Sequence, residues 1–171
     1  MNVYCIYASS YKCAVITQQL NTGVILPGVH AVQPQITQRK WVHGKPTEEL
    51  HEYLPGYIFL YTEEEEVDFR TLFRVNGILR ILGNRDDGYR LTGADLAFAK
   101  GLLEKEGVIG TVKTYAVGDR IHLADEIFRG ANGQILKVDK GRQRLKVRFS
   151  FDEKEWDIWV GYDMVENSEV E

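Results

Sequence analysis

The stretch RQRLKVRF, residues 142–149, decides how the last third of this chain folds. Side chains alternate between the two faces of a β-strand, so Leu145, Val147 and Phe149 share one face of this segment. Basic side chains occupy the opposite face, at a spacing of roughly 7 Å, about the repeat of phosphates along a nucleic-acid strand. The members of this basic row are Arg142, Arg144, Lys146 and Arg148.

The basic row has two interpretations. Lysines and arginines on an edge strand deter aggregation, which makes a solvated strand face one of them. Binding of a polyanion is the other. The region 129–148 holds seven basic residues and one acidic residue, Asp139, in a chain whose net charge is −4. This local excess favours nucleic-acid binding. The candidate contacts outside the row are Arg129, Lys137 and Lys140.

Short strands surround this segment and predict a small β-barrel within about fifty residues. Gly and Asp turns separate them, and the expected strands are 120–124, 133–138, 144–151 and 156–160. Trp156 and Trp159 could stack on bases. Their positions in an alternating strand favour packing of at least one of them in the barrel core.

The preceding region mixes strands and helices. It predicts strands at 3–8, 36–42, 57–61 and 78–82, with a weak strand in the loop 24–32 and a turn at 44–46. Helices are expected after Ser9, where Cys13, Ile16 and Leu20 recur at helical spacing, after the acidic run 63–66, and from Thr92 to Gly107. This order favours an α+β domain in which helices cover an antiparallel sheet.

The residues give little support for a metal site, a phosphate-binding loop, an enzyme or a membrane protein. The two cysteines and four histidines show no metal-ligand spacing, and no phosphate-binding loop is present, so we expect neither metal nor cofactor. An enzyme using Cys5 or Cys13 stays open as an alternative, although no charged activator adjoins Cys5. The absence of a signal segment or an apolar span predicts a cytoplasmic protein that does not enter membranes.

Two longer stretches resemble a known family. YLPGYIFLY, residues 53–61, followed by FRVNGILRILG, residues 73–83, resembles the core of the NusG N-terminal domain. VGDRIHLADEIFRGANGQILKVDKGRQRLKVRF, residues 117–149, resembles a KOW motif, with its VGD start and basic strand. The resemblance implies a ferredoxin-like α+β domain at 1–108, a linker at 109–116 and an SH3-like barrel at 117–171.

The NusG resemblance implies a monomeric, non-catalytic transcription elongation factor that binds the clamp helices of RNA polymerase through an apolar patch. Specialised members also touch the polymerase gate loop, at the place of Asp68, Phe69 and Arg70 here, and the segment 37–44 resembles a region facing upstream or non-template DNA. Leu54 stands where the family usually has Phe. The matching patch positions are Tyr7, Leu54, Pro55, Gly56 and Tyr57.

One departure from the general factor distinguishes this chain. Where the family offers an apolar pair to a ribosomal protein or to the Rho terminator, this chain has Asp152 after Phe151, followed by Glu153 and Glu155. Those contacts are therefore not expected. The chain looks similar to the LoaP-type antiterminators, whose barrel binds an RNA hairpin, so structured nascent RNA is the expected ligand. A stand-alone KOW-type RNA-binding protein of the ribosome is the alternative.

Overall fold

The computed structural model describes residues 1–166 and divides the chain into two compact units. The first consists of Met1–Gln35 and Glu52–Leu91. The second consists of Ile36–His51 and the chain from Thr92 onward. The sequence led us to expect a first domain ending at residue 108, whereas here the segment 92–108 lies in the same unit as the barrel strands.

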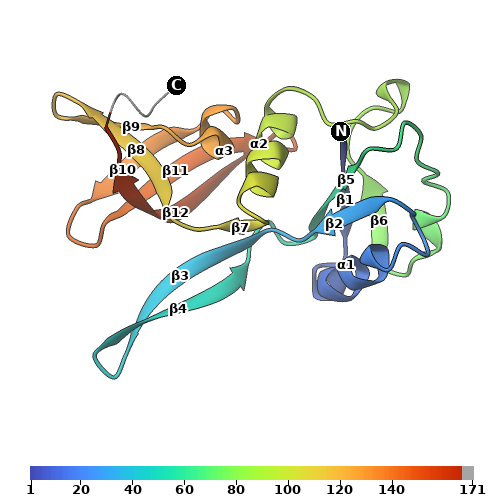
Figure 1. The fold of residues 1–171 in the computed structure, drawn as a ribbon, viewed down its shortest axis with the longest axis horizontal. Helices are drawn as coiled ribbons and strands as arrows, with labels where there is room; N and C mark the ends of the chain where they lie inside the picture. Colours follow the sequence, from blue (N-terminus) through green and yellow to red (C-terminus); the bar gives the residue numbers. More distant parts are fainter. Residues whose placement is uncertain (167–171) are drawn as a thin grey trace. The chain divides into compact units, whose positions relative to one another are not determined.

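The first unit is built on a four-stranded antiparallel sheet (Figure 1). Its order is β2-β5-β1-β6, and Cys5 in β1 lies opposite Phe59 in β5. All residues of β5 are buried, as its continuous apolar sequence predicted. The expected α+β class with an antiparallel sheet is confirmed. The strands are β1 (Asn2–Ala8), β2 (Val29–Val32), β5 (Tyr57–Thr62) and β6 (Ile78–Ile81).

Helix α1 (Cys13–Asn21) packs on one face of this sheet, after the 3-10 turn η1 (Ser10–Lys12). Ile16 and Leu20 are fully buried against the sheet, because residues three and four apart fall on one side of a helix. The buried residues of β1 and β5 on this face lie at alternate positions, and β2 and β6 add further residues. The face consists of Tyr4, Ile6, Ala8, Val29, Ala31, Ile58, Leu60 and Ile78.

The prediction of a helix after the acidic run 63–66 is wrong. This segment is irregular, and the helical turns that follow before residue 91 are the short 3-10 turns η2 (Leu72–Arg74) and η3 (Arg85–Asp87). The Asp68 carboxylate accepts hydrogen bonds from both the backbone N–H and the guanidinium of Arg70. Such local bonds compete with helical backbone bonds, and neighbouring acids add repulsion at helical spacing.

A polar hairpin belongs to the second unit. Strands β3 (Gln35–Val42) and β4 (Lys45–Glu52) pair with each other, and β7 (Val108–Ile109) pairs with β3. His43 and Gly44 form the turn, both with positive φ. The strand at 36–42 is confirmed, but β4 was missed because its sequence, KPTEELHE, is polar and contains a proline.

The rest of the second unit is a five-stranded barrel-like sheet in the order β10-β11-β12-β8-β9 (Figure 1). Its pairs are antiparallel except for β12 with β8. Strand β8 falls within the segment expected to be a linker. The inward residues of β11 are fully buried, which confirms the expected SH3-like barrel. The strands are β8 (Val112–Val117), β9 (Arg120–Leu123), β10 (Gln134–Asp139), β11 (Arg144–Phe151) and β12 (Lys154–Met164).

Helix α2 (Gly93–Glu104) lies alongside the barrel together with the short helix α3 (Glu126–Arg129). The ring of Phe98 stacks on Phe149 of β11, with centroids 4.9 Å apart. Glycine makes the close approach of the helices possible, because a Cβ at Gly101 would stand 2.5 Å from the Cα of Ile127. The apolar contacts of α2 are therefore shared with the barrel core, which explains its place in the second unit.

The Gly101 contact gives a stability prediction. Gly101→Ala should lower the free energy of unfolding by about 1–3 kcal/mol, because the added methyl forces α2 away from α3. Urea unfolding measures the change. Gly110→Ala is the matched control, since no atom lies within 4 Å of a Cβ at that position. Equal stability of the two variants would show that α2 is not closely packed on α3.

Candidate functional site

The outward face of β11 carries the cations of the basic row. Arg144, Lys146 and Arg148 alternate with buried Leu145, Val147 and Phe149, as the sequence predicted. Arg142 lies in the turn before the strand, so it is not part of the row on β11.

Neighbouring strands place acids beside two of these arginines. Asp157 of β12 lies opposite Arg148 and accepts two hydrogen bonds from its guanidinium, at 2.7 and 3.0 Å. Asp139 of β10 accepts one from Arg144 at 3.3 Å. The Arg148 hydrogen bonds lower the pKa of the Asp157 carboxyl, and the backbone N–H of Arg142 is the largest cause of a lowered pKa at Asp139. Both acids therefore stay charged, and both arginines are partly compensated.

The lysines of this face are not compensated in the same way. Lys137 of β10 lies opposite Lys146 of β11. Neither lysine forms a salt bridge within residues 1–166. The remaining candidates lie at the rim. Lys140 is exposed in the β10–β11 turn, and Arg129 pairs with Glu126 at 3.3 Å.

The two barrel tryptophans face different ways. Trp156 lies half-buried on the side of β12 that also carries buried Ile158, and its indole N–H donates to the Phe151 carbonyl at 3.0 Å. Trp159 lies on the outward face, opposite Lys146, with 37% of its surface exposed. The guanidinium of Arg144 stands 4.5 Å from the centroid of the Trp159 ring. Trp156 therefore packs toward the barrel core, whereas Trp159 does not.

The residues that the sequence offered for polymerase binding meet at one end of β1 and β5. Tyr7 and Tyr57 lie opposite each other with ring centroids 5.1 Å apart, and Arg80 covers the Tyr7 ring. A Cβ at Gly56 would stand 2.5 Å from the Tyr7 ring, so glycine permits this contact. Leu54 is 1% exposed.

Exposure separates these residues into two groups. Tyr57, like Leu54, is 1% exposed, whereas Pro55 is exposed and Tyr7 half-exposed. Phe69 lies apart from them, packed edge-on against Tyr4 with centroids 4.9 Å apart. Tyr7 and Pro55 are therefore the members of the patch that a partner can reach directly.

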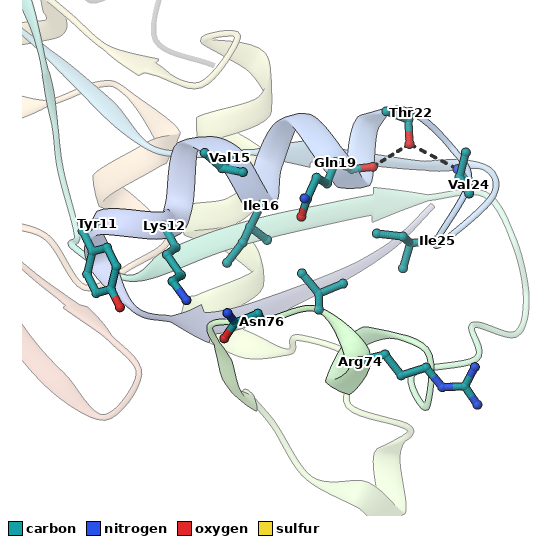
Figure 2. Close-up of a pocket in the computed structure, with 11 residues that line it drawn as sticks. Tyr11, Lys12, Val15, Ile16, Gln19, Thr22, Val24, Ile25, Arg74 and Asn76 are labelled. Atoms are coloured by element: carbon teal, nitrogen blue, oxygen red, sulfur yellow. Dashed lines mark hydrogen bonds between the residues drawn. The ribbon is translucent and has the colours of Figure 1, made fainter.

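An open groove of about 750 Å³ runs beside α1 in the same unit (Figure 2). Ile16 and Ile25 line it with apolar surface, while Lys12 and Arg74 add positive charge. Tyr11 stands at one end and is 81% exposed. The sequence analysis did not single out this groove, because its lining comes from segments about fifty residues apart.

The turn between β11 and β12 is acidic and tightly bent. Asp152 and Glu153 both have positive φ, of 53° and 57°. The Asp152 N–H donates to the Asp95 carboxylate, 3.2 Å away. Phe151, which precedes them, is fully buried. This turn therefore presents charge and no exposed aromatic ring.

The cysteines do not have the surroundings of a reactive thiolate. Cys5 and Cys13 are buried and not joined to each other. Burial is the main cause that raises the pKa of the Cys13 thiol, whereas an activated thiol has a lowered one. Among residues 1–166, no group of three or more His, Cys, Asp or Glu side chains could hold a metal ion, and no helix is long and apolar enough to cross a membrane.

Comparison with known proteins identifies relatives. The chain is 25% identical over 127 residues to the transcription termination/antitermination protein NusG of Rickettsia prowazekii (strain Madrid E), and 24% identical to that of Rickettsia typhi (strain ATCC VR-144 / Wilmington). Each match covers 74% of this chain and 66% of the relative. A solved structure of Thermotoga maritima NusG matches 94% of this chain and 93% of its own, with a TM-score of 0.53 and 15% identity. No protein-family model matches the chain.

An α+β sheet unit and a small barrel give this chain a fold similar to that of Thermotoga maritima NusG. The sequence matches show that the chain is similar to NusG proteins over 127 residues. The aligned region spans slightly less than two thirds of the Rickettsia proteins' length.

The acids beside the arginines give a prediction for the barrel face. Asp157→Asn should strengthen binding of single-stranded RNA, because it releases Arg148 for phosphate contact. The salt dependence should steepen by up to about 0.7 in the slope of log K against log salt. Fluorescence anisotropy over a salt series measures both. Asp119→Asn, an exposed acid in the β8–β9 turn, removes the same charge without freeing an arginine. If both variants gain equal RNA affinity, the effect comes from the change in net charge and not from the release of Arg148.

Proposed function

We propose that this protein is a transcription elongation and antitermination factor. Its first unit binds RNA polymerase, and its barrel binds nucleic acid, with structured nascent RNA as the favoured ligand. Suppression of pausing and termination follows if binding stabilises the elongating state of the polymerase. The role involves no catalysed reaction, and its proposed location is the cytoplasm.

The single observation that carries this proposal is the cationic outward face of β11 in a chain related to NusG. Lys137 and Lys146 lie opposite each other on adjacent strands, and neither forms a salt bridge within residues 1–166, although Asp157 interacts electrostatically with Lys146. Two lysines without salt bridges attract phosphates and contribute little to folding. Arg144 and Arg148 can exchange exposed carboxylates for phosphates, because such surface ion pairs are weak.

Polymerase binding is proposed for the Tyr7 end of the first sheet, at the clamp helices. Half-exposed Tyr7 is held by Tyr57 and Arg80, and Pro55 is exposed beside the Gly56 turn. A rigid aromatic ring at a surface is typical of residues that dominate binding energy. In this proposal buried Leu54 and Tyr57 position the patch rather than contact the partner.

The acidic turn supports a specialised member of the family similar to LoaP-type antiterminators. Asp152 and Glu153 occupy the tip of the hairpin, and Phe151 is buried. An apolar patch for a ribosomal protein or for Rho is therefore not offered here. Upstream or non-template DNA is a further proposed ligand, at the polar hairpin. There Lys40 pairs with Glu49 at 2.6 Å, and Trp41 is 73% exposed.

Polymerase docking is tested with a tyrosine variant of the full chain. Tyr7→Ala should weaken binding to core RNA polymerase about tenfold or more, because a central aromatic contact is lost. Biolayer interferometry measures the affinity, and thermal unfolding checks the fold. Tyr11→Ala, which removes an exposed tyrosine from the groove beside α1, should bind normally. Absence of polymerase binding by the parent chain would favour the stand-alone RNA-binding alternative.

Nucleic-acid binding is tested by charge reversal. Lys137→Glu combined with Lys146→Glu should abolish RNA binding at physiological salt, because two phosphate contacts become repulsive. Polymerase affinity should stay unchanged. Lys100→Glu with Lys154→Glu changes the net charge equally, outside the β10–β11 face. RNA binding that is lost equally in both double variants would exclude a specific role for this face.

A further inference from the structure

We propose that Trp159 and Arg144 form a stacking platform for one unpaired nucleobase of the RNA. This inference rests on the proposed RNA-binding role of the barrel and names the feature of the RNA that the barrel selects. The proposal starts from the position of Trp159, whose neighbours Ile158 and Val160 are buried while its own indole remains 37% exposed on the outward face.

Arg144 prepares the indole for stacking. Its guanidinium lies 4.5 Å from the ring centroid, in a cation–π contact, and its Nε is also hydrogen-bonded to Asp139. Two neighbours therefore restrain the arginine, and the arginine in turn restrains the indole. A side chain ordered before binding loses less conformational entropy when a ligand arrives. Both aromatic rings and guanidinium planes are surfaces on which bases stack.

Cations for the adjoining phosphates lie on the next two strands. Lys146 is directly opposite Trp159, and Lys137 is directly opposite Lys146. Adjacent strands are about 4.8 Å apart, so this line runs from the indole across two lysines over roughly 10 Å. A base on the platform would therefore place its own backbone near the two lysines. This combination of an aromatic surface and cations is complementary to a nucleotide strand.

The other strongly exposed tryptophan lacks this arrangement. Trp41 is 73% exposed, but the two cations that precede it are paired across the hairpin, Arg39 with Glu48 and Lys40 with Glu49. Exposure of an indole alone is therefore not the distinguishing feature. The distinguishing feature of Trp159 is its place beside two lysines that form no salt bridge among the described residues.

The geometry also restricts the kind of RNA. A base inside a duplex already stacks on its neighbours, so its faces are not available to a protein side chain. The platform consequently selects a base in a loop, a bulge or a single strand. Lys137 and Lys146 contact phosphates of paired and unpaired RNA alike, so they do not discriminate between the two.

Fluorescence anisotropy with the full-length chain tests this inference. The probes are a hairpin RNA with an unpaired loop and a fully paired duplex of equal length and composition. Trp159→Leu should weaken loop binding by roughly 5- to 150-fold, the range for loss of one base–aromatic stack. It should leave duplex binding unchanged. Trp159→Tyr keeps an aromatic face and should retain most of the affinity, and Tyr11→Leu, which removes an exposed aromatic ring outside the barrel, is the control. Thermal unfolding verifies that every variant is folded.

The outcomes separate this inference from the proposed function. If Lys146→Gln weakens RNA binding while Trp159→Leu behaves like Tyr11→Leu, the barrel contacts phosphates alone and the platform is refuted. If the parent chain binds neither RNA, the proposed function fails as well. A Trp159→Leu variant that binds RNA normally but loses polymerase affinity would identify this face as a protein interface, which also overturns the inference.

Discussion

The alternation of β11 between a buried and a solvated side is the constraint on which the barrel depends. Leu145, Val147 and Phe149 are at most 1% exposed, and the strand is paired on both sides, with β10 and β12. A shift of register by one residue would turn three cations into the core, at a cost of several kcal/mol for each unpaired charge. The same alternation that secures the core therefore also fixes the direction of the basic row.

Cross-strand neighbours then decide what each cation can do. Arg148 meets Asp157, Arg144 meets both Asp139 and Trp159, and the remaining lysines meet each other. The cations of the outward face therefore differ in their partners, because the arginines are hydrogen-bonded to acids and the lysines are not. Its arginines are held in place by acids and by an indole, while Lys137 and Lys146 remain available to phosphates. Held arginines suit positioning, and available lysines suit attraction of a polyanion.

Helix α2, which precedes the barrel strands in sequence, packs against the barrel. Phe98 stacks on Phe149, and Asp95 accepts a hydrogen bond from the acidic turn. Burial is the largest cause that raises the pKa of the Asp95 carboxyl, and nearby Asp152 and Glu153 add repulsion. The hydrogen bond from the Asp152 N–H favours the charged carboxylate and partly offsets this rise, so the net shift stabilises the folded state when Asp95 is protonated. The inner residues of β11 serve this helix as well as the barrel.

The sequence alone determined the alternation of β11, the antiparallel α+β class, the barrel, and three of the four residues of the basic row: Arg144, Lys146 and Arg148. These features follow from local patterns: alternation in strands, helical spacing in α1 and α2, and glycine or aspartate at turns. Tertiary structure decided which acid lies beside which cation, that Trp159 faces outward and that α2 adjoins the barrel. It also gave an irregular segment after residue 63 in place of the expected helix. These outcomes depend on strand register and on contacts between distant residues, which a local pattern does not contain.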